Sequence, residues 1–243
     1  MKDVTTWYSE RLDRDMTVAR WGHYGTPLLL FPTAGGDAQE VERNGLIAAL
    51  WEPIEAGRLK VYSCDSAAGQ TWLSGQHSWD YCCAFQNRFD SFIYEELVPA
   101  IHTDCGTPGL EIMVAGASIG AFNAVASLCR HPDIFTSAIA MSGTYDLERL
   151  LGFQATQEFY FSSPLLYLPN LDGGQQLDRL RRRFVVLAFG QGDAEDPEES
   201  RRMGQALGAK GIPNRVDAWG PEYPHDWPTW RDMLPRYLAE LQV

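Results

Sequence analysis

A serine between two glycines stands where an apolar segment gives way to a run of small residues. Residues 111–115 have the apolar character of a buried strand, and residues 119–130 have the pattern of a buried helix. In the turn Gly116-Ala117-Ser118-Ile119-Gly120, the two glycines allow a tight bend that exposes the serine hydroxyl. This arrangement is typical of a nucleophile, and we predict that Ser118 is catalytic.

A serine hydroxyl is a weak nucleophile until a base takes its proton, so the prediction requires a histidine elsewhere in the chain. His225 lies in a loop rich in glycine and proline, at residues 219–227, between the last expected strand and the last expected helix. Loops at strand ends commonly carry catalytic groups. We therefore predict that His225 is the general base.

An acid should orient the histidine, and the loop at residues 190–197 offers three carboxylates. Asp193 is the first choice and Glu195 is the alternative. Asp196 directly precedes Pro197 and has the character of a helix N-cap. With either acid, the chain order is nucleophile, acid, base, which is the order of α/β-hydrolases.

Two backbone N–H groups are expected to stabilise the negative oxygen of the transition state. One is the N–H of Ile119, at the N-terminus of the expected helix. The other should come from residues 31–36, a loop of small residues after an early strand. We predict Ala34 there, with Thr33 and Gly35 as alternatives.

Short apolar segments alternate with amphipathic segments along the chain, and this pattern predicts an α/β fold with a mostly parallel sheet covered on both faces. Residues 16–21 and 28–31 are expected to form an opening pair of strands. The other expected strands are 59–64, 111–115, 137–141, 184–189 and 215–219, and the expected helices are 91–102, 119–130, 197–210 and 229–241.

Two longer stretches, residues 65–81 and 151–176, are rich in aromatic residues and glycine and have no clear periodicity. Long loops of this kind commonly frame a binding site. We predict an apolar, partly aromatic pocket that includes Trp72 and Phe159. The chain is expected to form a single domain, residues 1–243, in which residues 151–176 form a small lid or insertion.

The chain resembles the putative-esterase family of α/β-hydrolases, which includes S-formylglutathione hydrolases, siderophore esterases, feruloyl esterases and mycolyltransferases. The resemblance rests on the segments Gly116-Ala117-Ser118-Ile119-Gly120-Ala121, His131-Pro132-Asp133-Ile134-Phe135, Ala140-Met141-Ser142-Gly143 and His225-Asp226-Trp227-Pro228-Thr229-Trp230. It implies an α/β-hydrolase fold and ester hydrolysis through an acyl-enzyme, without a cofactor. It carries over the roles of Ser118 and His225 but leaves the acid open between Asp193 and Glu195.

Charge and cysteine content narrow the partners. The chain has 20 basic and 32 acidic residues, a net charge of −12, which disfavours nucleic acid and anionic membranes as partners. The five cysteines and five histidines show no metal-ligand spacing, and the odd cysteine count is typical of reduced thiols. The longest apolar run near the start, residues 27–32, is too short to span a bilayer. We expect a cytoplasmic monomer or homodimer that binds no metal.

These observations favour a serine carboxylesterase that acts on a small or medium ester. Two alternatives use the same site differently. The aromatic stretches could exclude water from an acyl-enzyme, which would favour acyl transfer to an alcohol. A hydrolase-like protein that binds a ligand without catalysis is the third hypothesis.

Overall fold

A single eight-stranded sheet runs through the chain, of which the structure, a computed structural model, describes residues 1–242. The strands follow the order β1-β2-β4-β3-β5-β6-β7-β8 across the sheet. All neighbouring pairs from β4 to β8 are parallel, whereas β2 pairs antiparallel with both β1 and β4. The strands are β1 (Lys2–Ser9), β2 (Arg14–Trp21), β3 (Thr26–Phe31), β4 (Leu59–Cys64), β5 (Ile112–Ala117), β6 (Phe135–Met141), β7 (Phe184–Phe189) and β8 (Asn214–Ala218).

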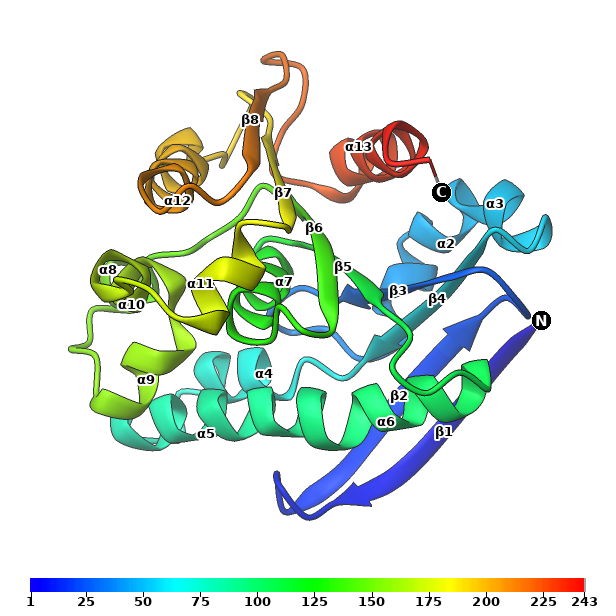
Figure 1. The fold of residues 1–243 in the computed structure, drawn as a ribbon, viewed down its shortest axis with the longest axis horizontal. Helices are drawn as coiled ribbons and strands as arrows, with labels where there is room; N and C mark the ends of the chain where they lie inside the picture. Colours follow the sequence, from blue (N-terminus) through cyan, green and yellow to red (C-terminus); the bar gives the residue numbers. More distant parts are fainter. Residues whose placement is uncertain (243) are drawn as a thin grey trace.

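Helices cover both faces of this sheet (Figure 1). One face packs against α1 (Glu40–Arg43), α2 (Leu46–Ala49), α3 (Trp51–Glu55) and the C-terminal helix α13 (Trp227–Glu240). The other face packs against α4 (Ala67–Leu73), α5 (Trp79–Phe92), the π-helical segment η1 (Ile93–Leu97), α6 (Val98–Cys105), α7 (Ile119–Arg130), α8 (Leu147–Leu151), α9 (Gln157–Ser162), α10 (Pro164–Tyr167), η2 (Leu168–Asn170), α11 (Gln175–Leu180) and α12 (Pro197–Ala209). The prediction of a mostly parallel sheet between helical layers is confirmed.

The central position of β3 in the sheet explains why its sequence is an uninterrupted apolar run. Leu28 and Leu30 contribute to the core on the α13 side, and Leu29 and Phe31 contribute to the core on the opposite side. Each of the four side chains is almost completely buried. A strand with helices on both faces needs apolar residues at every position, because successive side chains point to opposite faces.

The N-terminal part of the sheet differs from expectation. Residues 16–21 and 28–31 do not pair with each other, because β4 lies between β2 and β3. Strand β1 was not predicted: it is an edge strand with mostly exposed residues, so its polar sequence carries no hydrophobic signal. The register of β1 on β2 is nevertheless continuous, from Lys2 opposite Trp21 to Ser9 opposite Arg14.

The expected helix at 91–102 is longer than predicted, since α5, η1 and α6 follow one another without interruption from residue 79 to residue 105. The two stretches expected to be irregular, 65–81 and 151–176, contain helices instead. Their helices are short, and the apolar residues in them contact the core at irregular intervals, so sequence periodicity could not reveal them.

The parallel arrangement brings the C-terminal ends of β3, β5, β6, β7 and β8 to one edge of the sheet. The segments that follow these strands are 32–39, 118, 142–146, 190–196 and 219–226. Open α/β sheets bind their ligands at this edge. The segments predicted to carry the nucleophile, the acid, the base and the oxyanion donors therefore meet there.

Candidate active site

Ser118 occupies the turn between β5 and α7 and has a strained backbone, with φ 56° and ψ −122°. A residue with a side chain adopts such a conformation at a cost of about 1–3 kcal/mol, and such strain is concentrated at functional sites. Hydrogen bonds hold the turn on both sides: the Ser118 N–H donates to Met141 O at 3.0 Å, and the Thr144 N–H donates to Ser118 O at 3.3 Å. The loop after β6 therefore fixes the position of Ser118.

The two glycines of the turn are required by close backbone approaches. A Cβ atom on Gly116 would lie 2.3 Å from the carbonyl of Gly120. A Cβ atom on Gly120 would lie 2.6 Å from both Phe31 O and Pro32 O. The second contact shows that the start of α7 packs directly against the loop that follows β3.

The acid loop and the histidine loop are joined through their backbones. The N–H of Gln191 donates to Gly220 O at 3.2 Å, and the N–H of Gly192 donates to Tyr223 O at 3.0 Å. The N–H of His225 in turn donates to Asp193 O at 2.9 Å. Residues 190–193 and 220–225 consequently form one unit, in which the base is held at a fixed distance from the acid loop.

The structure places the carboxylate of Glu195, and not that of Asp193, beside His225. Asp193 contributes its backbone carbonyl to the contact with His225, while its side chain is exposed. Glu195 is the residue whose carboxylate faces the imidazole: Oε2 lies 3.9 Å from His225 Nδ1, and the side chain is 2% exposed. Asp196 caps α12 by accepting from the Glu198 N–H at 3.2 Å, as predicted.

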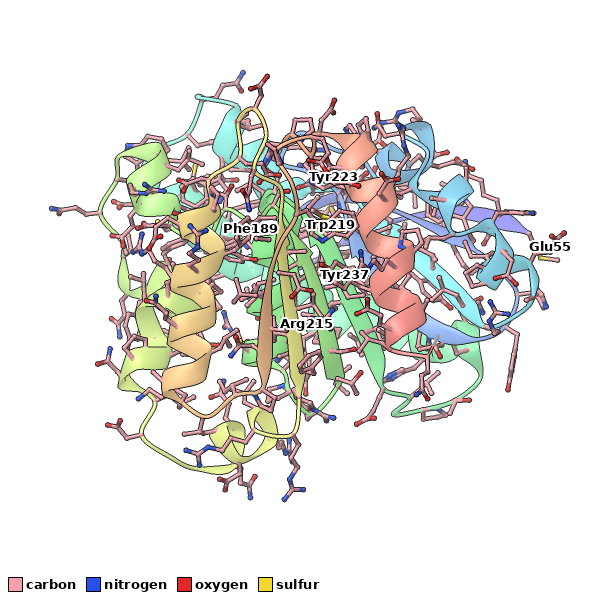
Figure 2. All side chains as sticks on the ribbon, turned by 90° about the horizontal axis from the view of Figure 1, so that it is seen from above. Glu55, Phe189, Arg215, Trp219, Tyr223 and Tyr237 are labelled. Carbon is pink, nitrogen blue, oxygen red and sulfur yellow. The ribbon has the colours of Figure 1, made fainter. Side chains whose placement is uncertain are left out.

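Aromatic side chains brace the segment that carries His225. Trp219 Nε1 donates to the Tyr237 hydroxyl at 2.7 Å, which ties the end of β8 to α13. The ring of Tyr223 packs edge-on against Trp219 at a centroid distance of 4.8 Å, and Figure 2 shows these three side chains together beside α13. The segment of glycine and proline before His225 is thereby anchored at both ends.

In the loop after β3, the N–H groups of Ala34, Gly35 and Asp37 have no hydrogen-bond acceptor among residues 1–242. The N–H of Thr33 already donates to Glu40 Oε2 at 2.8 Å, and that of Gly36 donates to Thr33 O at 3.1 Å. Thr33 is thus excluded as an oxyanion donor, whereas Ala34 and Gly35 keep their donors available. The N–H of Ile119 occupies the first position of α7, where no helical acceptor exists.

Ser118 and His225 line one cavity of about 550 Å³ at this edge of the sheet. Its other walls come from the loop after β6, from α8 and from the start of α12. The lining residues are Ser118, Ser142, Gly143, Thr144, Asp146, Arg149, Leu150, Ala194, Asp196, Glu199 and His225. Ser118 and His225 therefore share an opening large enough for a small molecule.

A sequence profile of the family described as "Putative esterase" matches residues 80–241. The chain belongs to the putative-esterase family. The matched region contains Ser118, Glu195 and His225, and the membership confirms the predicted class of enzyme, a serine carboxylic ester hydrolase. A comparison with curated protein sequences gives no match.

Solved structures similar to this esterase share its fold at low sequence identity. A ferulic acid esterase has a TM-score of 0.75 and 17% identity over 99% of this chain and 96% of its own. An S-formylglutathione hydrolase from Agrobacterium tumefaciens has a TM-score of 0.74 and 16% identity over 99% and 95% of the two chains. The enterobactin esterase FES from Shigella flexneri has a TM-score of 0.67 and 19% identity over 99% of this chain and 59% of its own. These likenesses confirm the α/β-hydrolase fold.

The predicted aromatic pocket is not formed by Trp72 and Phe159. Both side chains are buried, at 5% and 1% exposure, and neither lines the cavity that holds Ser118. Trp72 stacks on Phe153 and meets Phe159 edge-on, with centroids 5.0 and 5.8 Å apart. These rings fill the core between α4, α5 and α9.

The cavity wall formed by α8 and the start of α12 carries charged side chains, which were not predicted from the sequence. Arg149 Nη2 contacts Asp196 at 2.6 Å and Glu199 at 2.7 Å, and the hydrogen bond from Arg149 lowers the pKa of Asp196 below its usual value. Asp146 pairs with Arg202 at 2.8 Å. The residues lie about 50 positions apart in sequence, in α8 and α12, so no local motif could have identified them.

Metal ligation and membrane insertion find no support in the described residues. Among residues 1–242, no group of three or more His, Cys, Asp or Glu side chains is arranged to hold a metal ion. No helix in the same part of the chain has the length and apolar character needed to cross a bilayer. The five cysteines are free thiols, four of them buried.

Proposed function

We propose that the chain hydrolyses a small or medium carboxylic ester through an acyl-enzyme formed on Ser118. The observation that carries the proposal is the cavity that Ser118 and His225 both line, with the buried carboxylate of Glu195 on the Nδ1 side of the imidazole. In this proposal Ser118 is the nucleophile, His225 the base and Glu195 the acid. Ala34 and Ile119 supply the oxyanion donors.

In the first half of the reaction, Ser118 Oγ attacks the ester carbonyl and its proton passes to His225. Because His225 Nδ1 faces Glu195, Nε2 is the nitrogen that takes this proton. Glu195 stabilises the imidazolium, and the backbone N–H groups stabilise the oxyanion. The proton then moves from Nε2 to the alkoxide as the carbon–oxygen bond breaks and the alcohol leaves.

In the second half, a water molecule gives a proton to His225 and attacks the acyl carbonyl. His225 then returns a proton to Ser118 Oγ as the bond between Oγ and the acyl carbon breaks, which releases the acid and restores Ser118. The cavity is lined by several polar and charged groups and by one large apolar side chain, Leu150. This lining supports esters with a short acyl chain or a polar alcohol over long alkyl chains, because apolar groups gain little beside charged side chains.

The test is hydrolysis of p-nitrophenyl esters from acetate to octanoate by the wild type and by Ser118→Ala, with a fluorophosphonate probe applied to both. We expect turnover that is highest for the short esters and labelling of the wild type alone. Loss of the nucleophile should lower kcat by about 10⁶-fold, as in other serine hydrolases. Comparable turnover by Ser118→Ala would rule out the acyl-enzyme.

A further inference from the structure

We infer that Ser142 and Trp230 are positioning residues that hold the Glu195 carboxylate and the His225 ring in their working orientation. The inference rests on the proposed function, because it assigns to Glu195 the role of the acid. It concerns two residues outside the group of nucleophile, acid and base: Ser142 follows β6, and Trp230 lies in the first turn of α13.

The three side chains form a chain of hydrogen bonds with a fixed direction. Trp230 Nε1 lies 2.9 Å from Ser142 Oγ, and an indole N–H can only donate. Ser142 Oγ lies 2.5 Å from Glu195 Oε1, and an ionised carboxylate can only accept. The serine therefore accepts from the tryptophan and donates to the glutamate.

This donor is important because Glu195 has little access to water. Its side chain is 2% exposed, and the ionised form of a buried carboxylate requires hydrogen-bond donors. The Ser142 hydroxyl serves Oε1, while the neighbouring oxygen Oε2 faces His225 Nδ1. Holding one carboxylate oxygen thus determines where the other points.

Ser142 is itself tightly held. Its N–H donates to Ala188 O in β7 at 2.7 Å, and its side chain is buried. The residue before it, Met141, accepts from the Ser118 N–H, and Thr144 donates back to Ser118 O. Ser142 also has a backbone φ of 47°, a value that is unusual for a residue with a side chain. Its backbone thus lies between the turn of Ser118 and β7, the strand that leads into the loop of Glu195.

Trp230 contacts His225 directly and is connected to Glu195 through the Ser142 hydroxyl. Its ring meets His225 edge-on, with centroids 5.2 Å apart and planes at 86°. The Trp230 side chain is 3% exposed and also packs against Trp227. One residue of α13 thus limits the rotation of the imidazole through its ring and orients the Ser142 hydroxyl through its N–H.

The experiment compares Ser142→Ala, Ser142→Gly, Trp230→Phe and the double variant Ser142→Ala/Trp230→Phe. Glycine removes the hydroxyl and accepts the positive φ without strain, so it separates the hydroxyl from the backbone. Phenylalanine removes the indole N–H and keeps an aromatic ring beside His225. Ser137→Ala, at the opposite end of β6, is the matched control, and Ser118→Ala measures the background.

We expect both Ser142 variants to lower kcat by about 10- to 100-fold, the range for one hydrogen bond to a buried charge, with KM changed less than about threefold. Trp230→Phe should cost less. The double variant should lose little more than Ser142→Ala, since the indole N–H acts through the hydroxyl.

Wild-type kcat in Ser142→Ala and Ser142→Gly would overturn the inference. So would additive losses in the double variant, since these would show that the indole N–H does not act through the Ser142 hydroxyl. Thermal denaturation of each variant separates folding from positioning. If Ser118→Ala remained active, the proposed function itself would fail, which distinguishes that outcome from failure of the positioning role alone.

Discussion

The carboxylate that faces His225 is determined by one turn of the backbone. Ala194 has φ 62°, an unusual value for a residue with a side chain, and it reverses the chain between Asp193 and Glu195. As a result Asp193 presents its carbonyl to the histidine, and Glu195 places its carboxylate inside. The two residues are two positions apart, so a sequence can locate the loop without revealing which side chain turns inward.

This difference predicts opposite effects of two similar substitutions. Glu195→Gln should lower kcat by about 10³- to 10⁴-fold, because a neutral amide cannot stabilise the imidazolium. Asp193→Asn should leave kcat within about threefold of the wild type, since its backbone carbonyl is unchanged. Steady-state kinetics with p-nitrophenyl acetate measures both. A larger loss in Asp193→Asn than in Glu195→Gln would restore Asp193 as the acid.

The turn that holds Ser118 and the loop that holds His225 could be located from the sequence because each follows a local pattern, and their catalytic roles stay predictions. The nucleophile turn requires glycine at positions 116 and 120, and the backbone approaches of 2.3 and 2.6 Å explain why. The charged wall of Arg149, Asp196 and Glu199 could not be predicted, because it forms only when α8 and α12 pack together.

At the scale of elements, α4 positions the oxyanion loop. A Cβ atom on Gly69 would lie 2.4 Å from Ala34 O and 2.8 Å from Ala34 Cα, so helix and loop touch backbone to backbone. The contact is reinforced by Gln70 Nε2, which donates to Gly36 O at 2.9 Å. Residues 65–81 have no clear periodicity, so this support could not be predicted from the sequence.

Gly69→Ala should therefore displace the oxyanion donor while the distant nucleophile turn remains intact. We expect kcat to fall by about 10- to 1000-fold, the range for a misplaced or missing oxyanion donor. Fluorophosphonate labelling should slow to a similar degree. Gly173→Ala is the matched control, because an added Cβ there contacts nothing within 4 Å, and it should behave as the wild type. Unchanged kcat in Gly69→Ala would exclude this role for α4.

Most elements could be predicted where burial produces a clear pattern. The bounds of β4, β7 and α7 agree with the sequence prediction residue by residue. The exposed edge strand β1 and the short helices between 147 and 180 were missed, because neither has the regular alternation of apolar residues that marks a half-buried element. The position of β4 between β2 and β3 depends on pairing between distant segments.

At the scale of the whole molecule, a charged cluster joins the N-terminal strands to α6 at the sheet edge opposite the cavity. Asp104 contacts Arg20 at 2.6 Å and Lys60 at 2.7 Å, and it accepts from the Tyr62 hydroxyl at 2.6 Å. Burial of Asp104 acts to raise its pKa, but the hydrogen bonds from Lys60 and Tyr62 outweigh burial and lower the pKa below 3.8. The Lys60 side chain is 4% exposed.

Asp104→Asn should reduce the free energy of unfolding by about 2 kcal/mol at pH 7, because it leaves the buried Lys60 ammonium without a countercharge. The folded state favours ionised Asp104, so this contribution is complete above about pH 5 and is lost as pH falls through the lowered pKa. The difference between wild type and variant should therefore narrow toward pH 3. Urea denaturation at several pH values measures it, and kcat at pH 7 should stay unchanged. A difference that grows in acid would contradict this assignment.

The order of strands also has a consequence for synthesis of the protein. From β3 onward the sheet extends outward in chain order through β5, β6, β7 and β8, and the His225 loop and α13 are added last. A nascent chain would display the Ser118 turn long before the base and the Trp230 brace emerge from the ribosome. Such a chain would be unable to cleave esters until the His225 loop and α13 had also been translated.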